Sequence, residues 1–314
     1  MPARDKLLSL PPGRFRLLRA DDWSDYALLD SGDGRKLERF GTVVIDRPDS
    51  QALWTPQSPT TSWEADAVFA SEHSEDDDRG RWRYPKGRPE DVWPVRWRGL
   101  KAGARCTAFR HLGLFPEHSV HWSWAEDRLR AANRPTRVLN LFGYTGMMSL
   151  ACARAGAEVV HLDASPKSIG YGRDNQAASN LDEATIRWIC DDAMKFLARE
   201  IRRGRTYDGI VLDPPKYGRG PNKEVWQLSD QLKDLLSLVR QVLSPDPLFV
   251  ILTVYAVRLS YIAVGQALSS NLAGLGGEIE WGEMTLPERG RGFDLPTAVY
   301  ARWSSDPLDS GLGD

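Results

Sequence analysis

Hydrophobic and polar positions follow two different patterns along the chain, and the change of pattern divides it into two parts. In residues 26–34 (YALLDSGDG) and 40–50 (FGTVVIDRPDS), short apolar-polar alternations are interrupted by Gly, Pro, Asp and Ser. Such alternation is typical of β-strands separated by turns. We therefore expect residues 1–110 to form a β-rich N-terminal domain, followed by a second domain over residues 111–314.

From about residue 137, short apolar runs alternate with longer stretches of helical period. The predicted strands are residues 137–142, 158–163, 186–190, 207–213 and 248–253, and each is followed by a predicted helix. Repeated strand–helix units predict a parallel, doubly wound α/β sheet with helices on both faces. The last two apolar runs, 277–284 and 297–303, are joined by a loop too short for a crossover helix, so we expect an antiparallel hairpin at the sheet edge.

Composition limits the class of protein. The chain has 314 residues, of which 41% are hydrophobic and 27% charged, and a net charge of −2, so it lacks the strongly basic signature of many nucleic-acid-binding proteins. Its three cysteines have no metal-binding spacing, which favours a reducing compartment and no metal site. The N-terminus lacks the apolar core of a signal peptide, and no apolar run reaches the roughly 20 residues that span a bilayer. We expect a cytoplasmic protein without membrane contact.

The first strand of the α/β part runs into a glycine turn, Phe142-Gly143-Tyr144-Thr145-Gly146, directly before a predicted helix. Two glycines let the backbone approach a ligand, and a helix N-terminus offers amide groups without partners. The turn lacks the third glycine of the dinucleotide fingerprint, and many glycine pairs serve only a tight turn. Asp163 favours a nucleoside-binding site, because it ends the second strand 20 positions after Gly143, where an acid can accept hydrogen bonds from ribose hydroxyls.

Acids at strand ends also have a simpler interpretation as helix caps. For Asp163 this is the weaker interpretation, because Ser165 and Pro166 directly after it offer a better cap and first turn. The third strand ends in Asp191-Asp192-Ala193, and either acid could cap the next helix or accept a hydrogen bond from an adenine amino group. Asp192 is the better ligand candidate.

Four motifs in combination, LNLFGYTG, HLDAS, DDAMKFL and LDPPKYGRG, resemble a class I S-adenosylmethionine (SAM)-dependent methyltransferase. More narrowly, they are similar to the bacterial 23S rRNA methyltransferase family that modifies cytosine at carbon 5 or guanine at nitrogen 7. The resemblance covers about residues 113–303 and implies a Rossmann-like, seven-stranded sheet with an antiparallel last strand. It also implies that SAM is the cofactor and that GLFPEH, residues 113–118, lies near it.

The same resemblance implies which residues bind the cofactor. Phe142, Gly143, Tyr144, Thr145 and Gly146 would wrap the methionine end, Asp163 would hold the ribose, and Asp192 with Ala193 would border the adenine. Ala164 and Asp213 complete the expected cofactor-binding set.

The segment Asp213-Pro214-Pro215-Lys216-Tyr217 follows the fourth strand, and it is either a plain loop or the catalytic corner. Proline has no N–H to satisfy and fixes the backbone, so neighbouring carbonyl groups can be aimed at a substrate. Asp213 could accept hydrogen bonds from a base edge or an amine, and Tyr217 could stack on a planar ring. Lys216 could contact phosphate or simply face solvent. The resemblance favours the catalytic interpretation.

The chain departs from the relatives that methylate cytosine. Methylation at carbon 5 requires a cysteine thiolate that adds to the ring, and the relatives carry this cysteine after the fifth strand. The corresponding stretch here is Leu252-Thr253-Val254-Tyr255, with valine where the cysteine would stand. The sequence therefore favours an acceptor atom with its own lone pair, nitrogen or oxygen.

RNA contact is suggested by residues 79–110, which contain ten Lys or Arg against two acids, with Trp, Tyr and Phe interleaved. Basic groups for phosphates and aromatic rings for bases suit an RNA surface. The simpler interpretation is a strand with one buried and one solvated face, next to the acidic run 74–78, which would neutralise part of the charge. The loop over residues 287–292 is a second candidate contact.

The sequence leaves several functions open. We expect a SAM-dependent methyltransferase that acts on a nitrogen of an RNA base, with rRNA as the favoured substrate. A small-molecule or protein substrate is an alternative, and so is a non-catalytic SAM- or RNA-binding module. A nicotinamide-dependent dehydrogenase is disfavoured by the missing third glycine and by the terminal hairpin.

Overall fold

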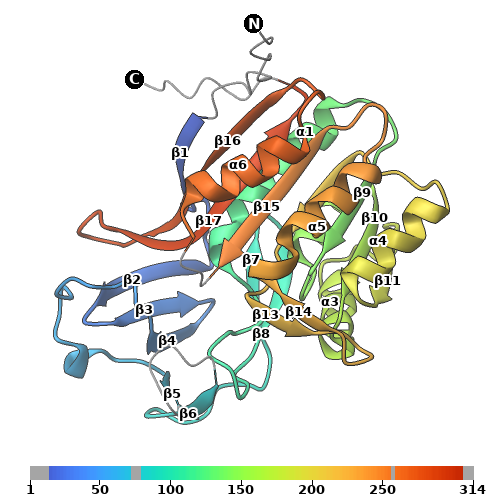
Figure 1. The fold of residues 1–314 in the computed structure, drawn as a ribbon. Helices are drawn as coiled ribbons and strands as arrows, with labels where there is room; N and C mark the ends of the chain where they lie inside the picture. The colour runs from blue at the N-terminus through green and yellow to red at the C-terminus, as the bar shows by residue number, and fades with distance from the viewer. Residues whose placement is uncertain (1–13, 72–78, 256–258, 307–314) are drawn as a thin grey trace, which may run out of the picture.

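The computed structural model describes residues 14–71, 79–255 and 259–306, so the acidic run 74–78 lies outside the described residues. Its centre is a mixed sheet of eight strands in the order β1-β16-β17-β15-β12-β9-β10-β11 (Figure 1). The strands are β1 (Arg14–Arg19), β9 (Arg137–Leu141), β10 (Glu158–Asp163), β11 (Ile186–Cys190), β12 (Gly209–Leu212), β15 (Phe249–Tyr255), β16 (Glu278–Pro287) and β17 (Asp294–Ser304).

The parallel part of this sheet confirms the strand–helix repeats. β11, β10, β9, β12 and β15 pair in parallel with their neighbours, as crossover helices require. β17 runs antiparallel to both β15 and β16, which confirms the terminal hairpin and the antiparallel last strand. Several strands are buried on both faces, and this explains their continuous apolar runs.

The sheet has one strand more than the expected seven. β1, from the start of the chain, pairs in parallel with β16, so the terminal hairpin is not the edge of the sheet. A six-residue strand with mostly exposed side chains gives little signal in the sequence. Residues 14–19 therefore lie in the large sheet, although their pattern grouped them with the N-terminal strands.

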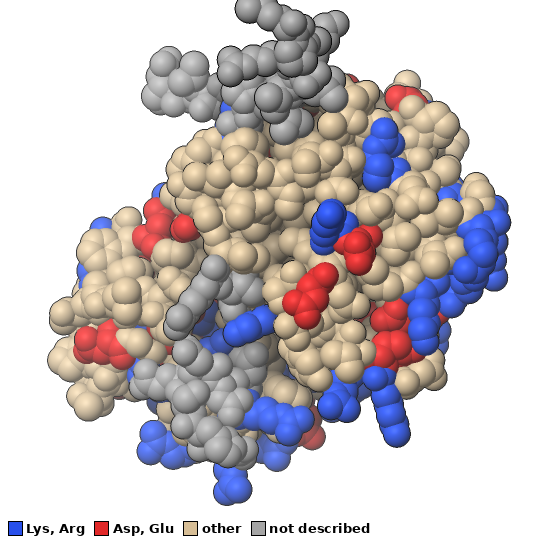
Figure 2. All heavy atoms as spheres, viewed as in Figure 1, with Lys and Arg blue, Asp and Glu red and all other residues tan. Residues whose placement is uncertain are grey.

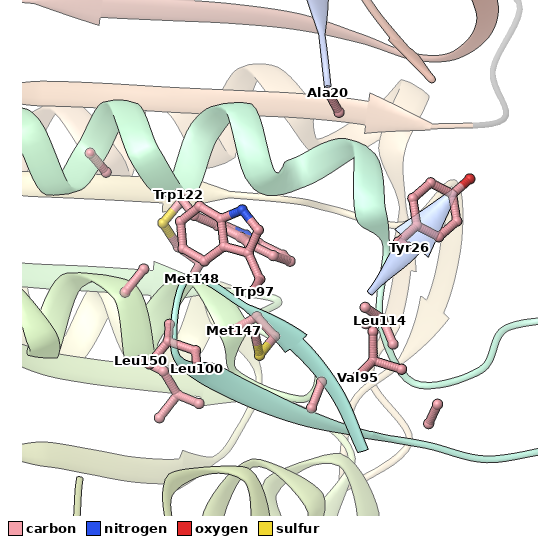
Figure 3. Close-up of a cluster of buried hydrophobic side chains, with 14 of the residues drawn as sticks. Ala20, Tyr26, Val95, Trp97, Leu100, Leu114, Trp122, Met147, Met148 and Leu150 are labelled. Atoms are coloured by element: carbon pink, nitrogen blue, oxygen red, sulfur yellow. The ribbon is translucent and has the colours of Figure 1, made fainter. Parts of the chain in front are cut away.

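Helices cover both faces of the sheet, as expected. One face carries α1 (Ser119–Ala131), α2 (Met147–Arg154) and α3 (Pro166–Ala178), and the other carries α4 (Ala193–Arg202), α5 (Leu228–Gln241) and α6 (Tyr261–Asn271). On the first face, Trp97 and Trp122 meet edge to face at 5.1 Å next to Met148 (Figure 3). This cluster joins the N-terminal strands to the sheet in one continuous core. Among the described residues, no helix has the length and apolar character needed to cross a bilayer.

The N-terminal part is rich in β-structure, as its pattern predicts. Five strands form a sheet in the order β2-β3-β4-β5-β6, and β7 pairs with β8 in a separate hairpin that packs against α3. The bounds are β2 (Tyr26–Gly32), β3 (Arg35–Phe40), β4 (Val43–Pro48), β5 (Ala67–Ser71), β6 (Gly80–Arg83), β7 (Trp93–Trp97) and β8 (Leu100–Ala104). Short 3₁₀ turns lie at Thr60–Ser62 and Pro116–His118.

The loop between β16 and β17 binds the N-terminal sheet. Arg291 is bidentate to Glu288 and also donates to the carbonyl oxygens of Ser31 and Thr55. Glu288 is 4% exposed and accepts from the Ser31 hydroxyl at 2.6 Å. These two charged side chains of the candidate RNA-contact loop are therefore engaged in holding that loop against the N-terminal sheet.

Candidate active site

Every residue predicted for the site lies at one edge of the sheet. β9, β10, β11 and β12 are parallel, and the register pairs Leu141 with both Leu162 and Leu212. The segments that follow these strands therefore start side by side. Ligands bind at this carboxyl edge in open α/β sheets.

The glycine turn, residues 142–146, has an unusual backbone. Phe142 and Tyr144 have φ of +57° and +51°, and Gly146 has φ of +85° at the start of α2. A Cβ on Gly143 would lie 2.4 Å from the His161 ring, and one on Gly146 would lie 2.6 Å from the Trp188 ring. Glycine is therefore required at both positions because any side chain would clash with the rings packed beneath the turn. The sequence had suggested a different reason, the close approach of a ligand to the backbone.

Polar groups beneath the turn fix its position. Asn140 donates to the hydroxyl of Ser149, which is 2.9 Å from His161 Nδ1. Burial lowers the pKa of His161 to about 3, so this imidazole is neutral at physiological pH. A neutral ring can accept or donate here without the cost of a buried charge.

Asp163 is bound to the turn by its own carboxylate. Its Oδ2 accepts from the amide of Tyr144 at 2.9 Å, and its Oδ1 accepts from the amide of Ser165 at 2.8 Å. Burial raises the pKa of Asp163, and these two amide hydrogen bonds oppose the rise. Ser165 caps α3 through Ser168, as predicted, so Asp163 is not that cap. Ala164 lies between them and accepts from Cys190 Sγ at 3.5 Å.

Asn175 connects the turn to the N-terminal part of the chain. Its side chain donates to the carbonyl of Thr145 at 3.0 Å and accepts from the amide of Gly103 at 2.9 Å. The hydroxyl of Thr145 in turn donates to the carbonyl of Gly113 at 2.5 Å. The turn is therefore held from α3, from β8 and from the segment that precedes α1.

The two acids after β11 have different roles. Asp192 is the N-cap of α4 and accepts from the amide of Lys195 at 2.9 Å. Asp191 forms an ion pair with Arg199 and accepts from the amide of Asp192. The cap interpretation of Asp192 is thus confirmed. A carboxylate has about four lone-pair sites, so capping leaves it able to accept from a ligand as well.

The proline corner brings together an acid and a histidine. Asp213 follows β12, and its Oδ2 lies 3.7 Å from His118 Nε2. Burial raises the pKa of Asp213, the charge of His118 opposes that rise, and Glu117 and Asp163 add to it. Pro214 is buried, whereas Pro215, Lys216 and Tyr217 are exposed.

An aromatic wall lies next to this corner, and sequence reasoning missed most of it. The Phe115 ring lies 5.6 Å from Tyr144, 6.0 Å from His118 and 6.4 Å from Tyr255. Arg110 donates to the Tyr255 hydroxyl at 3.1 Å. The motif GLFPEH was the only signal in the sequence for Phe115 and His118. Arg110 was marked only as the last residue of the basic run 79–110, and nothing local marks Tyr255; their proximity depends on how the N-terminal part docks.

None of the three cysteines lies at the proline corner. Cys152 is fully buried in α2, and burial raises its pKa. Burial also raises the pKa of Cys106 to about 11. Cys190 ends β11, which is separated from β12 by β9 and β10, and its pKa is raised as well. Val254 is 1% exposed within β15. The described site therefore offers no thiolate to attack a substrate.

The basic residues between 79 and 110 are divided by the fold. In β7, Trp93 and Trp97 are buried while Arg96 is exposed, as in a strand with one core face. Arg105 is 8% exposed, with its guanidinium 3.4 Å from the centre of the Tyr171 ring. Four others form ion pairs: Lys86 with Glu64, Arg88 with Asp91, Arg96 with Asp25 and Arg98 with Asp22. Arg79, Arg81 and Arg83 are exposed on or beside β6.

These features fit a nucleoside cofactor with a carboxylate and a charged sulfur. The first amide groups of α2 follow the turn directly and have no partner inside the helix, so they suit the cofactor's carboxylate. Asp163 retains lone pairs for ribose hydroxyls. Within the described ranges, no three His, Cys, Asp or Glu side chains are grouped as a metal site would require.

Comparison with solved structures supports the same class. A structure described as the SAM-dependent methyltransferase from Agrobacterium tumefaciens is 44% identical, with a TM-score of 0.88 over 94% of this chain and 98% of that one. A SAM-dependent methyltransferase from Streptococcus mutans, 16% identical, shares the fold with a TM-score of 0.67 over 90% and 76% of the two chains.

Curated relatives match over shorter stretches. Ribosomal RNA large subunit methyltransferase I of Shewanella denitrificans is 38% identical over 112 residues, which are 34% of this chain and 27% of that protein. The protein of the same name from Tolumonas auensis is 32% identical over 169 residues, 52% of this chain and 40% of its own length. The chain thus spans less than half the length of these two relatives.

A family match covers the carboxyl edge of the sheet, where the candidate site lies. Residues 61–254 match the S-adenosylmethionine-dependent methyltransferase family, and this range includes the glycine turn, Asp163, Asp192 and the proline corner. Because that match extends over more than half of the chain, and the Agrobacterium structure matches nearly all of it, the chain belongs to the S-adenosylmethionine-dependent methyltransferases, whose cofactor is SAM.

Proposed function

We propose that this protein transfers a methyl group from SAM to a nitrogen atom of a base in RNA, with rRNA as the substrate class, and that no covalent cysteine intermediate forms. The proposal is carried by one observation. The corner at Asp213 combines a carboxylate with the imidazole of His118 at 3.7 Å, and no cysteine lies there. A hydrogen-bond acceptor without a thiolate suits an acceptor atom that has its own lone pair.

In this proposal the cofactor lies along the edge formed by the ends of β9, β10 and β11. Residues 142–146 and the start of α2 hold its methionine end, Asp163 accepts from the ribose, and Asp192 with Ala193 borders the adenine. Bound SAM supplies an electrophilic methyl group on a sulfonium. Asp213 directly follows β12, the strand next to β9, so its carboxylate would lie close to the methyl group of a cofactor held at this edge.

The residues around Asp213 then position the base. Asp213 accepts a hydrogen bond from an amino or ring N–H group, which orients the nitrogen lone pair toward the methyl group. The aromatic wall of Phe115, Tyr144 and Tyr255 limits water, and Tyr217 stacks on a base next to the reacting one. Methyl transfer depends mainly on alignment, so these positioning contacts suffice without a strong base. Asp213 takes up the proton that the methylated nitrogen releases, and His118 Nε2 lies 3.7 Å from its carboxylate, too far for a hydrogen bond but near enough to act on it electrostatically.

RNA is favoured over other substrates because the curated relatives are named as rRNA methyltransferases and because the N-terminal sheet carries exposed arginines. Three exposed arginines on or beside β6 offer positive charge to RNA phosphates: Arg79, Arg81 and Arg83. The three free thiols suit a reducing, cytoplasmic compartment, where rRNA is found.

The test is a comparison of cells with and without the gene, grown with isotope-labelled methionine. Mass spectrometry of rRNA nucleosides should show one N-methylated nucleoside that disappears with the gene. Purified protein should restore it on rRNA from the deletion cells, and the Asp213→Asn variant should not. The proposal would be contradicted if deleting the gene instead removed the labelled methyl group from 5-methylcytosine, from a protein or from a small molecule.

A further inference from the structure

A two-stranded hairpin is inserted directly after the proline corner. It consists of β13 (Tyr217–Arg219) and β14 (Val225–Gln227), joined by a turn in which Lys223 has φ of +70°. Isolated hairpins of this size are not stable in water. Tertiary contacts must therefore hold it, and they are present at both its base and its tip.

The base of the hairpin is fixed to the site. Trp226 is 5% exposed, its indole N–H donates to the carbonyl of Pro215 at 2.6 Å, and its ring lies 5.1 Å from that of Phe142. The amide of Leu228 donates to the carbonyl of Lys216 at 3.1 Å. The hairpin is thus attached to both the proline corner and the glycine turn.

The tip of the hairpin is fixed to the first turn of α4. Lys195 Nζ lies 2.5 Å from Glu224 Oε1, and the amide of Asn222 donates to Glu224 Oε2 at 2.8 Å. The hydrogen bond from Lys195 lowers the pKa of Glu224 to about 2, so the carboxylate is charged at neutral pH. Lys195 follows the N-cap Asp192 by three positions, so the tip lies at the adenine end of the expected cofactor site.

The two faces of the hairpin differ. Pairing places Gly218 opposite Trp226 on the docked face, and it places Tyr217 opposite Gln227 and Arg219 opposite Val225 on the other face. On that outer face Tyr217 is 53% exposed. The outer face therefore carries an aromatic ring and a cation that no contact with the rest of the fold explains.

Positive charge gathers around this face. Lys216, Arg219 and Lys223 are exposed, and among the described residues none of them has an ion pair, whereas Glu224 is paired with Lys195. On the face drawn in Figure 2, Lys and Arg side chains stand out over the lower part of the molecule, together with a few Asp and Glu, while the upper half is mostly uncharged. The hairpin thus carries local positive charge on a protein whose net charge is −2.

We propose that the outer face of the β13–β14 hairpin binds the single-stranded RNA segment that flanks the target nucleotide, with Lys216, Arg219 and Lys223 on phosphates and Tyr217 stacked on a neighbouring base. This inference rests on the proposed RNA substrate and deepens it. Cations that follow a backbone together with an aromatic platform are what single-stranded nucleic acid requires. Tyr217 is four residues from Asp213, so a stacked neighbour would adjoin the reacting base.

The charge test uses a triple variant, Lys216→Gln, Arg219→Gln and Lys223→Gln. The probe is a fluorescein-labelled, mixed-sequence, single-stranded RNA of about 20 nucleotides, a length that covers the roughly 4–16 nucleotides of a typical site, titrated at several salt concentrations. Each lost phosphate contact lowers the slope of log K against log salt by about 0.7, so the triple variant should lose about 2. Arg202→Gln is the matched control, because Arg202 is exposed at the other end of α4.

The stacking test compares Tyr217→Ala with Tyr217→Phe. Loss of the ring should weaken binding of the same RNA by about 5- to 150-fold, whereas phenylalanine keeps the ring and most of the affinity. SAM affinity by calorimetry and the melting temperature are measured for every variant. Both should match the wild-type protein, since these side chains are exposed.

The outcomes separate the two proposals. If the wild-type protein binds the RNA and the variants bind it equally well, the hairpin inference is overturned while the RNA substrate stands. If the wild-type protein does not bind the RNA, both the proposed RNA substrate and the hairpin inference are contradicted. If the variants fold normally but lose SAM affinity instead of RNA affinity, the hairpin is a cofactor clamp and the inference is wrong.

Discussion

The imidazole of His118 lies 3.7 Å from the carboxylate of Asp213, although the two residues are 95 positions apart in the chain. His118 precedes α1, whereas Asp213 directly follows β12. Their proximity places a titratable pair beside the proline corner. The protonation of Asp213 therefore depends on a residue from a different part of the fold.

The first prediction concerns this pair. Ionised Asp213 is the stronger hydrogen-bond acceptor and can take up the proton that the nitrogen releases, so activity should fall as the pH drops through its pKa, which burial raises. The charge of His118 lowers that pKa, and Glu117 and Asp163 raise it. His118→Gln should therefore move the acidic limb of the kcat/KM profile to higher pH. An unmoved limb would show that His118 does not control the ionisation of Asp213.

Asp163 should contribute to cofactor affinity and to the shape of the turn. Asp163→Ala removes the acceptor for the amides of Tyr144 and Ser165 together with the ribose contact, and we expect SAM binding to weaken by about 1–3 kcal/mol. Asp163→Asn keeps one carbonyl acceptor and should lose less. Calorimetric titration of SAM measures both, and unchanged affinity in the alanine variant would reject the ribose assignment.

Gly146 should not tolerate a side chain. Its φ of +85° is unfavourable for other residues, and a Cβ would lie 2.6 Å from the Trp188 ring. We expect Gly146→Ala to lower the free energy of unfolding by about 1–3 kcal/mol and to weaken SAM binding. Gly170→Ala is the matched control, because Gly170 lies inside α3 with nothing within 4 Å of its Cβ position, and there alanine should stabilise by roughly 0.5–1 kcal/mol. Equal unfolding curves for the two variants would refute the packing argument.

The cysteines should be dispensable for methyl transfer. Cys106→Ser, Cys152→Ala and Cys190→Ser, alone or together, should leave kcat within about threefold of the wild-type value, because losing a covalent catalyst would cost orders of magnitude more. The buried Cys152 makes some loss of thermal stability expected in its variant. A protein–RNA adduct trapped through any of these thiols would contradict the proposed mechanism.

His161 should make the fold sensitive to acid. Its pKa is about 3 in the folded protein because of burial, against about 6.5 in an unfolded chain. Between these two pH values the unfolded chain binds more protons than the folded protein. The contribution of neutral His161 to the free energy of unfolding is therefore fully present above pH 6.5, and it declines by about 1.4 kcal/mol per pH unit as the pH falls toward 3. His161→Gln should show a smaller loss between pH 6.5 and 4.5 in denaturant unfolding. The same loss in both proteins would assign the acid sensitivity to other groups.

Sequence patterns predicted the α/β part well because its signals are local. The apolar runs 137–142 and 248–253 are buried on both faces, and Ser165 with Pro166 begins α3 as expected. The glycine turn and Asp163 lie at the ends of adjacent strands, so their proximity follows from βαβ geometry. The features that the sequence did not predict, such as the place of β1 in the large sheet, depend on contacts between distant segments. Hydrophobic periodicity carries no information about such contacts.

The sequence by itself determined the parallel sheet, the position of the glycine turn, the acid at the end of the second strand and the absence of a cysteine at the corner, because each is written within a few neighbouring residues. Only the tertiary structure decided that β1 joins the sheet, that Arg105 and Arg110 are buried beside the site, that Arg291 holds the β16–β17 loop against the N-terminal sheet and that His118 lies next to Asp213. Those contacts join residues from about 60 to more than 260 positions apart. The free energy that selects such contacts comes from burying whole surfaces together, and no short stretch of sequence reports it.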